Sequence, residues 1–311
     1  MLKSYDKGFI TLAFGKYYRK IAKNLLESYK IYNKNLPFAV ITDKVDKFVN
    51  NFDFIIVDNP KSKVFFNKLF LNEYSPFDKT IFIDADVLVF TDISFYFDLF
   101  SDLNVPFSPL GRNFIISELE NRVGYFDFAK TKKYNLKYTY IFNGGLYYFN
   151  RDAKNIFNSA QDIARLKYDY GFSFSGDEPC FALAMSIHNS LCLNNDKYGA
   201  KGMCWFPRAN NFKINVKTGE ISYSFGNTFN ENETALVHFG TFNTYKPFYR
   251  SLVWIIKRKQ NDFAFSAYKN KVIYFYFYII YKVKSLFNFF IDFTKRCFLK
   301  LKKILKRGDN K

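Results

Sequence analysis

Two aspartates interrupt an apolar stretch of the chain in a pattern that favours metal-ion chemistry. Asp84 and Asp86 separate two apolar, β-branched runs, residues 81–83 and 87–90, which together have the pattern of one buried strand. Unpaired carboxylates are costly in such a strand, so we predict that it ends near Asp84. Side chains two positions apart in an extended chain point the same way, so both carboxylates can converge on one divalent cation.

The plainer interpretation of the same motif is a strand end that carries two solvated acids. A bare Asp-x-Asp is a short motif, and short motifs have a high false-positive risk. The elements around Asp84 and Asp86 therefore have to decide between a metal site and an ordinary strand end.

Strand and helix patterns alternate around the two aspartates. Strand patterns cover residues 8–14, 36–43, 52–57 and 81–84, and helical patterns cover residues 17–29, 67–74 and 151–167. This alternation predicts an α/β fold with a mostly parallel sheet flanked by helices. Ligands of such sheets bind at the carboxyl ends of the strands, where Thr11, Ala13, Asp43 and the two aspartates all fall.

A second polar motif, Asn143-Gly144-Gly145, lies inside the apolar strand pattern of residues 140–150. Glycine within a strand indicates a bulge or a close approach of the backbone to a ligand. The alternative is a plain hairpin, since Asn-Gly also favours a tight turn.

Two acids and one histidine complete the set of candidate residues. Asp177 and Glu178 precede Pro179 at the start of a predicted helix, where acids usually serve capping and the helix dipole. At the mouth of a site they could instead orient a sugar or act as a base. His238, at the end of a short strand, is one of two histidines, and a lone histidine is more often a satisfied core residue than a ligand.

Most of the net positive charge of the chain lies in its last 55 residues. The 311 residues have a formal charge of +18, and residues 257–311 carry 15 Lys or Arg and 3 Asp or Glu, a net of +12. This basic segment is rich in Phe, Leu and Tyr but its unbroken apolar run, 272–281, is too short to span a bilayer. It predicts an amphipathic tail on an anionic membrane surface, with packing on the domain or a partner chain as the alternative.

Cysteine usage and the amino terminus favour a cytoplasmic location. The four cysteines form no Cys-x-x-Cys pair, which argues against a zinc or dithiol motif, and they have the pattern of reduced thiols. Residues 1–20 lack the apolar core and cleavage site of a signal peptide.

In sequence order, these motifs resemble the metal-dependent GT-A glycosyltransferases that include glycogenin and the bacterial lipopolysaccharide galactosyl- and glucosyltransferases. The resemblance covers about residues 5–250. It rests on six matches: Lys68-Leu-Phe-Leu, residues 74–79, Ile-Phe-Ile-Asp84-Ala85-Asp86, Phe142-Asn-Gly-Gly145, Asp177-Glu178 and His238-Phe-Gly240 with Lys246-Pro247-Phe248. It implies a GT-A domain over residues 1–255, followed by the basic helical tail over residues 256–311.

The resemblance also implies a role for each residue. Asp84, Asp86 and His238 would be the metal ligands, and the histidine favours Mn²⁺ over Mg²⁺. The donor, a nucleotide-sugar and most simply a UDP-sugar, would be bound by Thr11, Ala13, Tyr17, Asp43, Lys68, Asp84, Ala85, Gly144, Gly145, Gly240 and Lys246. The transferred sugar would face Asn143, Asp177 and Glu178, and retention of anomeric configuration is implied.

Two positions depart from the usual pattern of this family. The family usually has Asp-Gln where this chain has Asp177-Glu178, so an acid stands where an amide is expected, and it could be a nucleophile or a base. The last motif has Phe248 in place of Trp, and Gly240 follows His238 after one intervening residue.

The leading hypothesis is therefore a glycosyltransferase that acts at the cytosolic face of a membrane on a surface-polysaccharide or lipid-linked glycan acceptor, without nucleic acid as a partner. A sugar-phosphate nucleotidyltransferase is the enzymatic alternative, but no glycine- and arginine-rich loop follows the first strand pattern. A basic membrane- or nucleic-acid-binding module is the non-enzymatic alternative, and it leaves the acids at the strand ends unexplained.

Overall fold

The computed structural model describes most of the first 260 residues and one later helix. The described ranges are 5–61, 64–116, 128–131, 134–166, 169, 176–194, 203–205, 210–215, 220–225, 228–230, 235–259 and 275–283. The chain divides into two compact units, residues 1–240 and 241–311. This division falls before residue 255, and the predicted domain boundary there stays a prediction.

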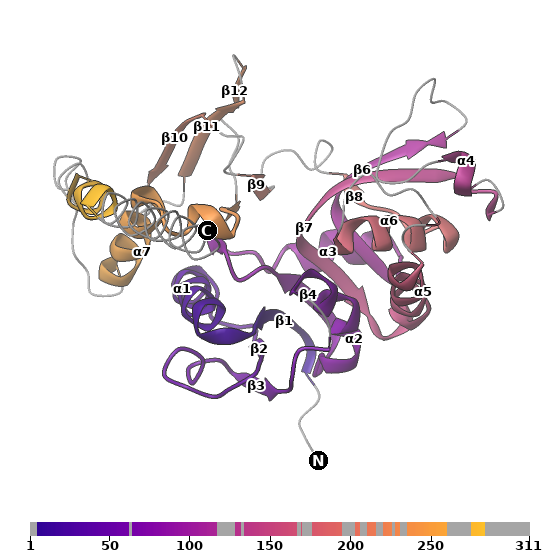
Figure 1. Cartoon of the computed structure of the whole chain (residues 1–311), viewed down its shortest axis with the longest axis horizontal. Coiled ribbons are helices and arrows are strands. Elements are labelled where there is room, and N and C mark those ends of the chain that lie inside the picture. The colour runs from indigo at the N-terminus through magenta and orange to yellow at the C-terminus, as the bar shows by residue number, and fades with distance from the viewer. Residues whose placement is uncertain are drawn as a thin grey trace, which may run out of the picture. The chain divides into compact units, whose positions relative to one another are not determined.

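The first unit is built on a seven-stranded sheet with the order β3-β2-β1-β4-β7-β6-β8 (Figure 1). Its strands are β1 (Tyr5–Ala13), β2 (Phe38–Thr42), β3 (Phe54–Val57), β4 (Phe77–Ile83), β6 (Phe107–Ile115), β7 (Tyr138–Asn150) and β8 (Leu193–Asn194). Strands β3, β2, β1 and β4 are parallel, and only β7 runs antiparallel to its neighbours β4 and β6. The predicted fold class, a mostly parallel α/β sheet, is confirmed.

Helices cover both faces of this sheet because its strands are apolar on both sides. Phe9 and Ile81 belong to a buried cluster with α1 (Gly15–Tyr32) and α3 (Tyr96–Asp102). Their neighbours Ile10 and Phe82 belong to a second cluster. That cluster includes residues of the 3₁₀ helix η1 (Val64–Phe70) and of the helices α2 (Leu71–Tyr74), α5 (Lys154–Arg165) and α6 (Asp177–Ile187). The 3₁₀ turn η4 (Arg151–Ala153) leads into α5, and the short α4 spans Phe128–Thr131.

The two apolar runs around the aspartates lie in different sheets. Strand β4 ends at Ile83, as predicted, but the second run forms β5 (Val87–Val89) and does not continue β4. Strand β5 pairs with β13 (Leu236–His238), which also pairs with β9 (Met203–Trp205). The expectation of a single buried strand is therefore wrong, because the aspartates turn the chain out of the first sheet into this second one.

Strand β7 passes through the Asn-Gly-Gly motif as a bulge. Gly111 of β6 pairs with Phe142, whereas Pro109, two residues earlier on β6, pairs with Tyr147. Strand β7 thus holds extra residues between these two pairs, and the hairpin alternative for Asn143-Gly144 is wrong.

The remaining elements lie outside the main sheet. Strands β10 (Asn210–Asn215), β11 (Glu220–Phe225) and β12 (Thr228–Asn230) form an antiparallel sheet of their own. The second unit contains the 3₁₀ turn η7 (Thr241–Asn243), α7 (Pro247–Lys259) and a helix over residues 275–283. The rest of the predicted amphipathic tail lies outside the described residues. In the described ranges, no helix has the length and hydropathy that a bilayer span requires.

A buried arginine fixes the loop after β2. Arg19 of α1 pairs with Asp43 and, at 2.8 Å, with Asp46. Burial by itself would raise the pKa of both carboxyl groups. Backbone N–H donors and the guanidinium outweigh burial, so both pKa values lie below their ordinary range.

This pairing predicts an acid-sensitive contribution to stability. Because the pKa values of Asp43 and Asp46 are lower in the folded state, the stabilisation is present above about pH 4 and is lost as pH falls through the folded pKa values. Arg19→Met should lower the free energy of unfolding by about 1 kcal/mol at neutral pH and by less at about pH 3. Urea denaturation at both pH values measures this, with the exposed Arg165→Met as control. An equal effect of Arg19→Met at both pH values would contradict the assignment.

Candidate active site

The turn between β4 and β5 presents the two aspartates. The backbone N–H of Asp84 donates to the carbonyl of Gly145 at 3.0 Å, and the N–H of Val87 donates to the carbonyl of Asp84 at 3.1 Å. The first bond connects the turn to the bulge of β7, and the second closes the turn itself. The positions of both carboxylates are thus fixed by backbone hydrogen bonds.

Strand pairing brings His238 to the same turn. In the antiparallel pair of β13 and β5, His238 lies opposite Val87, the residue after Asp86. The N–H of Phe239 then donates to the carbonyl of Asp86 at 3.1 Å. The pairing of three residues of β13 with three of β5 therefore holds His238 beside the aspartates, although it is distant from them in sequence.

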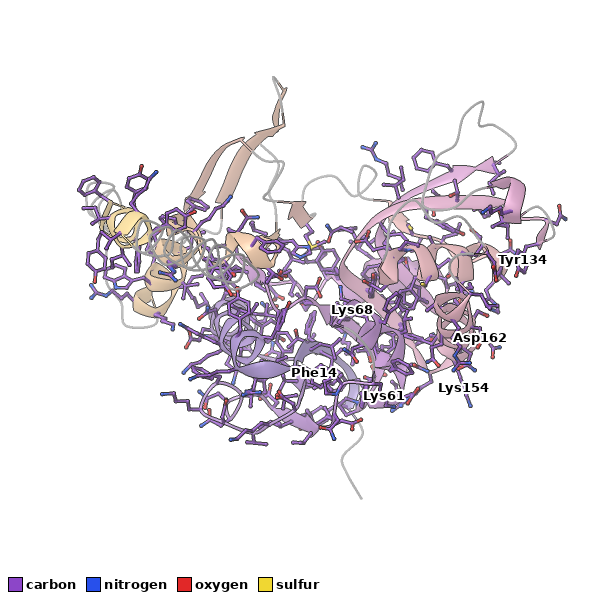
Figure 2. All side chains as sticks on the ribbon, in the orientation of Figure 1. Phe14, Lys61, Lys68, Tyr134, Lys154 and Asp162 are labelled. Atoms are coloured by element: carbon purple, nitrogen blue, oxygen red, sulfur yellow. The ribbon has the colours of Figure 1, made fainter. Side chains whose placement is uncertain are left out.

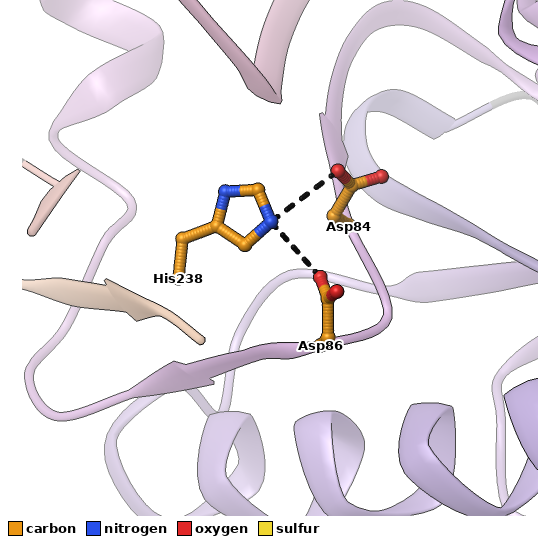
Figure 3. A group of neighbouring side chains, drawn as sticks. All are labelled: Asp84, Asp86 and His238. Atoms are coloured by element: carbon orange, nitrogen blue, oxygen red, sulfur yellow. Dashed lines mark ion pairs between the residues drawn. The ribbon is translucent and has the colours of Figure 1, made fainter. Parts of the chain in front are cut away.

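The three side chains converge on one small volume (Figure 3). His238 Nε2 lies 3.0 Å from Asp86 Oδ1 and 3.6 Å from Asp84 Oδ2. One ligand atom from each residue lies within 4.8 Å of the others. Two carboxylates and one imidazole, gathered in this way, have the donor chemistry of a divalent cation site.

Asn143 determines which imidazole nitrogen faces the acids. The N–H of Gly145 donates to Asn143 Oδ1 at 2.9 Å, which identifies that atom as the acceptor oxygen. His238 Nδ1 lies 2.7 Å from the same oxygen and therefore carries the donated proton. Nε2 is left directed toward the carboxylates, in the orientation that a metal-binding histidine needs.

Burial makes negative charge costly at this site. Burial is the main cause that raises the pKa of Asp84 to about 6, against the lowering effect of Lys68. Burial alone would lower the pKa of His238, but Asp86 and Asp84 raise it above its ordinary value. The raised pKa of Asp84 shows that its negative charge is costly here, and the raised pKa of His238 shows that the two carboxylates favour a positive charge beside them. A divalent cation supplies such charge.

Lys68, labelled in Figure 2, joins the aspartates to a second group of polar residues. Its Nζ lies 2.9 Å from Asp84 Oδ2, 3.6 Å from Asp177 Oδ2 and 2.8 Å from the carbonyl oxygen of Gly144. Burial would lower its pKa, but Asp177 and Asp84 raise it above the ordinary lysine value. Lys68 thus stays charged between two carboxylates, and its predicted contact with the donor stays a prediction.

The second group lies where α6 begins. Asp177 is 3% exposed and accepts a short hydrogen bond from the hydroxyl of Tyr147. Glu178 accepts the N–H of Gly144 at 2.7 Å and is more exposed than Asp177. The acids of this motif therefore contact the bulge of β7, and they are linked to the metal-ligand candidates through Lys68.

Close packing explains both glycines of the bulge. A Cβ on Gly145 would lie 2.5 Å from His238 Nδ1, and a Cβ on Gly144 would lie 2.7 Å from the hydroxyl of Tyr147. The predicted close approach of this backbone is therefore an approach to the protein's own side chains.

The residues predicted to hold the nucleotide lie at the ends of β1 and β2. Thr11 and Ala13 are fully buried in β1, and Ala13 pairs with Thr42. Asp43 follows β2 and accepts the N–H of Gly15 at 2.8 Å. Tyr17 lies in the first turn of α1, half-buried. Their contacts with a donor stay predictions.

The other predicted donor residues are divided between the two units. Ala85 lies between the aspartates, and Gly240 has a φ of +69°, which favours glycine at that position. Lys246 belongs to the second unit, where it precedes α7. Its predicted contact with a diphosphate stays a prediction.

The sequence analysis missed two polar residues of this region, Tyr147 and Arg19. Tyr147 is buried, and a buried tyrosine hydroxyl needs a hydrogen-bond partner, so its place three residues after Gly144 was an available signal. Arg19 lies in the helix after β1, and no local pattern pairs it with acids on a loop 24 residues away.

Comparisons with known proteins found solved structures of similar fold. No protein-family model and no curated protein matches the chain. The matched structures include the glycosyltransferase GlyE of Streptococcus pneumoniae TIGR4, with 16% identity, a TM-score of 0.44, and coverage of 62% of this chain and 46% of that one. The chain thus spans less than half of the length of that GlyE structure.

Two further matched structures cover a larger share of this chain. The galactosyltransferase LgtC, solved with donor and acceptor sugar analogs, has 15% identity and a TM-score of 0.47 over 85% of this chain and 99% of that one. The bifunctional WbbM has 12% identity and a TM-score of 0.47 over 77% of this chain and 46% of that one. At these levels of similarity, the case for function depends on the chemistry of the site.

The packing at Gly145 gives a direct test of the metal site. Gly145→Ala should displace His238 and reduce the affinity for Mn²⁺ by about tenfold or more, because one ligand loses its support. Gly144→Ala is the matched control, since its Cβ would meet Tyr147 and Glu178 and not the imidazole. Calorimetric titration of both folded variants with Mn²⁺ measures the difference. Equal Mn²⁺ affinities would show that His238 is not a ligand.

Proposed function

We propose that this chain is a metal-dependent glycosyltransferase. It moves a hexose or N-acetylhexosamine from a nucleotide-sugar, a UDP-sugar, to a surface-polysaccharide or lipid-linked glycan acceptor. The observation that carries the proposal is the convergence of Asp84, Asp86 and His238 within 4.8 Å, at the carboxyl edge of a mostly parallel sheet.

The residues around this cluster fit the breaking of a sugar–diphosphate bond. Asp84, Asp86 and His238 would hold a divalent cation, which would supply stabilisation for the negative charge that develops on the leaving nucleoside diphosphate. Asn143 holds the imidazole of His238 in its ligand orientation. Lys68 holds Asp84 in place and balances its charge. Because Asp86 and His238 are nearly buried, bulk water screens this site little.

The donor lies along the carboxyl ends of the first strands in this proposal. The base and ribose take the edge formed by β1 and β2, with Tyr17 stacked on the base, and Lys246 binds the diphosphate. The residues assigned to the donor are Thr11, Ala13, Tyr17, Asp43, Lys68, Asp84, Ala85, Gly144, Gly145, Gly240 and Lys246.

The transferred sugar faces Asn143 and the start of α6. Asp177 is held by Tyr147 and Lys68, so it orients its neighbours and the sugar. Glu178 is the more exposed acid and acts on the sugar, as a nucleophile or as a base. The anomeric configuration is retained.

Removal of one metal ligand tests the proposal. The wild-type protein should release UDP from one member of a UDP-sugar panel when Mn²⁺ is present and lose this activity with chelator. Asp86→Ala should lower the rate by about a hundredfold or more, because one electrostatic contact to the transition state is lost. The measurement is UDP release, with thermal shift under Mn²⁺ and UDP as a second readout.

Asp78→Ala is the control for this experiment, because Asp78 is an exposed acid of β4, the strand that precedes the turn with Asp86. It should keep both the activity and the stabilisation by Mn²⁺ and UDP. If Asp86→Ala keeps both as well, or if nucleic acid alone stabilises the wild-type protein, the proposal is refuted.

The second unit supports a peripheral location on the cytosolic face of a membrane. The helix over residues 275–283 exposes large apolar side chains, among them Phe275 at 61%, Tyr276 at 60%, Ile279 at 46% and Val283 at 64%. It lies in a segment with a net charge of +12 over residues 257–311. An exposed aromatic helix in a basic segment fits insertion between anionic lipid headgroups.

Vesicle sedimentation tests this location. Phe275→Ser with Ile279→Ser should lower binding to phosphatidylglycerol-containing vesicles by about tenfold or more, since two exposed apolar side chains that would insert into the lipid are lost. Deletion of residues 271–311 should abolish the binding. Val57→Ser, which alters an exposed apolar residue of β3, is the control. Unchanged sedimentation of the deletion variant would refute the membrane contact.

A further inference from the structure

A pocket lies at the end of the main sheet opposite to the candidate active site. Strand β4 begins there and β7 ends there, and Lys79 of β4 pairs with Asn150 of β7. A strand rises about 3.3 Å per residue, so the Cα atoms of Lys79 and Asp84 are roughly 16 Å apart. The pocket has a volume of about 230 Å³, and its polar lining consists of Lys79, Ser101, Asn104, Tyr148, Asn150 and Asp152.

The segment between α3 and β6 forms one wall of this pocket. Asn104 follows the end of α3 with a φ of +50°, a left-handed conformation that glycine and asparagine adopt after a helix. The N–H of Asn104 donates to the carbonyl of Ser101 at 3.0 Å, and the N–H of Asn150 donates to the carbonyl of Pro106 at 2.9 Å. These backbone bonds hold the wall in place against β7.

A buried tyrosine supports the pocket from the side of the sheet. Tyr148 is 2% exposed, and its ring stacks on that of Phe100 in α3 with the ring centroids 5.2 Å apart. Its hydroxyl forms a hydrogen bond with the side chain of Ser101. The packing of α3 on the sheet therefore fixes this side of the pocket as well.

Two polar side chains of the lining remain available to a ligand. In the part of the chain that the structure describes, the ammonium group of Lys79 has no ion pair and the amide of Asn104 has no hydrogen bond. Lys79 is only partly exposed. A ligand that accepts a hydrogen bond from its ammonium group is therefore favoured, because a polar group removed from water needs a partner.

The charges at this end of the sheet have both signs. Lys7 of β1 lies opposite Lys79 in the strand register. Burial raises the pKa of Tyr148, and Asp6 and Asp152 raise it further, so both carboxylates lie near its hydroxyl. An anion would meet the aspartates and a cation would meet the lysines. A neutral ligand rich in hydroxyl groups suits both, because each hydroxyl can donate and accept a hydrogen bond.

We propose that this pocket binds one neutral sugar residue of a glycan, at a second site separate from the candidate active site. Hydroxyl groups of the sugar bond to Lys79, Asn104 and Asp152, and its apolar face packs on Val105 and Pro106. The volume lies below the range of about 300–1,000 Å³ that drug-sized ligands occupy, so the pocket suits one sugar ring. In the proposed glycosyltransferase, this site would hold part of a glycan chain and raise its effective concentration.

Binding of neutral oligosaccharides to the full chain tests this site, with chelator present to remove metal from the candidate active site. The probes are chitohexaose, maltohexaose and galactohexaose, titrated by saturation-transfer NMR. At least one probe should bind, and Asn104→Gly and Lys79→Met should each weaken its binding by about fivefold or more, since hydrogen bonds to the sugar are lost. Glycine suits the φ of Asn104, and methionine keeps most of the apolar stem of the lysine, so both variants should fold.

Matched controls separate the pocket from other surfaces. Asn189, at the end of α6, has a φ of +52° and lies outside the pocket, so Asn189→Gly makes the same exchange and should leave binding unchanged. Asp86→Ala should leave it unchanged as well, because the candidate active site is a different site. Excess inorganic phosphate should not displace the oligosaccharide.

Four results would overturn this inference: no binding of any probe, no loss of binding in Asn104→Gly and Lys79→Met, an equal loss in Asn189→Gly, or displacement by phosphate. Loss of binding in Asp86→Ala would also overturn it, because the sugar would then belong to the candidate active site. The release of UDP with Mn²⁺ should be unchanged in Asn104→Gly. Failure of the pocket therefore leaves the proposed glycosyltransferase function standing, and absence of UDP release from the wild-type protein would refute that function alone.

Discussion

The site depends on keeping three carboxylates in one buried volume. Asp84, Asp86 and Asp177 repel one another, and their charges are costly because Asp86 and Asp177 are buried and Asp84 is partly buried. Lys68 and His238 offset that repulsion through contacts of 2.9 to 3.6 Å. A cluster so rich in acids is hard to explain as a device for stability, because replacing buried charges with apolar residues is often neutral or stabilising. The presence of these acids in a largely buried site favours a role in binding a cation.

Backbone geometry supplies the room that this charge cluster needs. The bulge of β7 takes residues 143–146 out of register, and two residues without a Cβ let the backbone approach His238 and Tyr147. The same bulge supplies the carbonyl that Lys68 binds and the N–H that Glu178 accepts. One irregular segment therefore connects the metal-ligand candidates with the acids of α6, which explains why glycine occurs twice inside an otherwise apolar strand.

The sequence predicted local order better than it predicted pairing between distant segments. Local patterns located β1, α1, β2 and α6, because α1 buries one face, β1 and β2 are short apolar runs, and Pro179 marks the start of α6. They did not separate β5 from β4, since the partner of β5 is β13, almost 150 residues later, and no local pattern encodes that register. His238 was an ambiguous histidine by itself, and only the family resemblance connected it to the aspartates. Tyr147 and Arg19 escaped notice because their partners lie far away in sequence.

The two adjacent acids at the start of α6 have been given different environments, and this difference bears on the chemistry. Asp177 is buried, accepts the hydroxyl of Tyr147 and lies 3.6 Å from Lys68, so its carboxylate is engaged on two sides. Glu178 has greater exposure and contacts the N–H of Gly144 at 2.7 Å. A group that reacts with a sugar must reach solvent-accessible space, whereas a group that holds others in place benefits from burial. In the proposed glycosyltransferase, these environments favour a positioning role for Asp177 and a reacting role for Glu178.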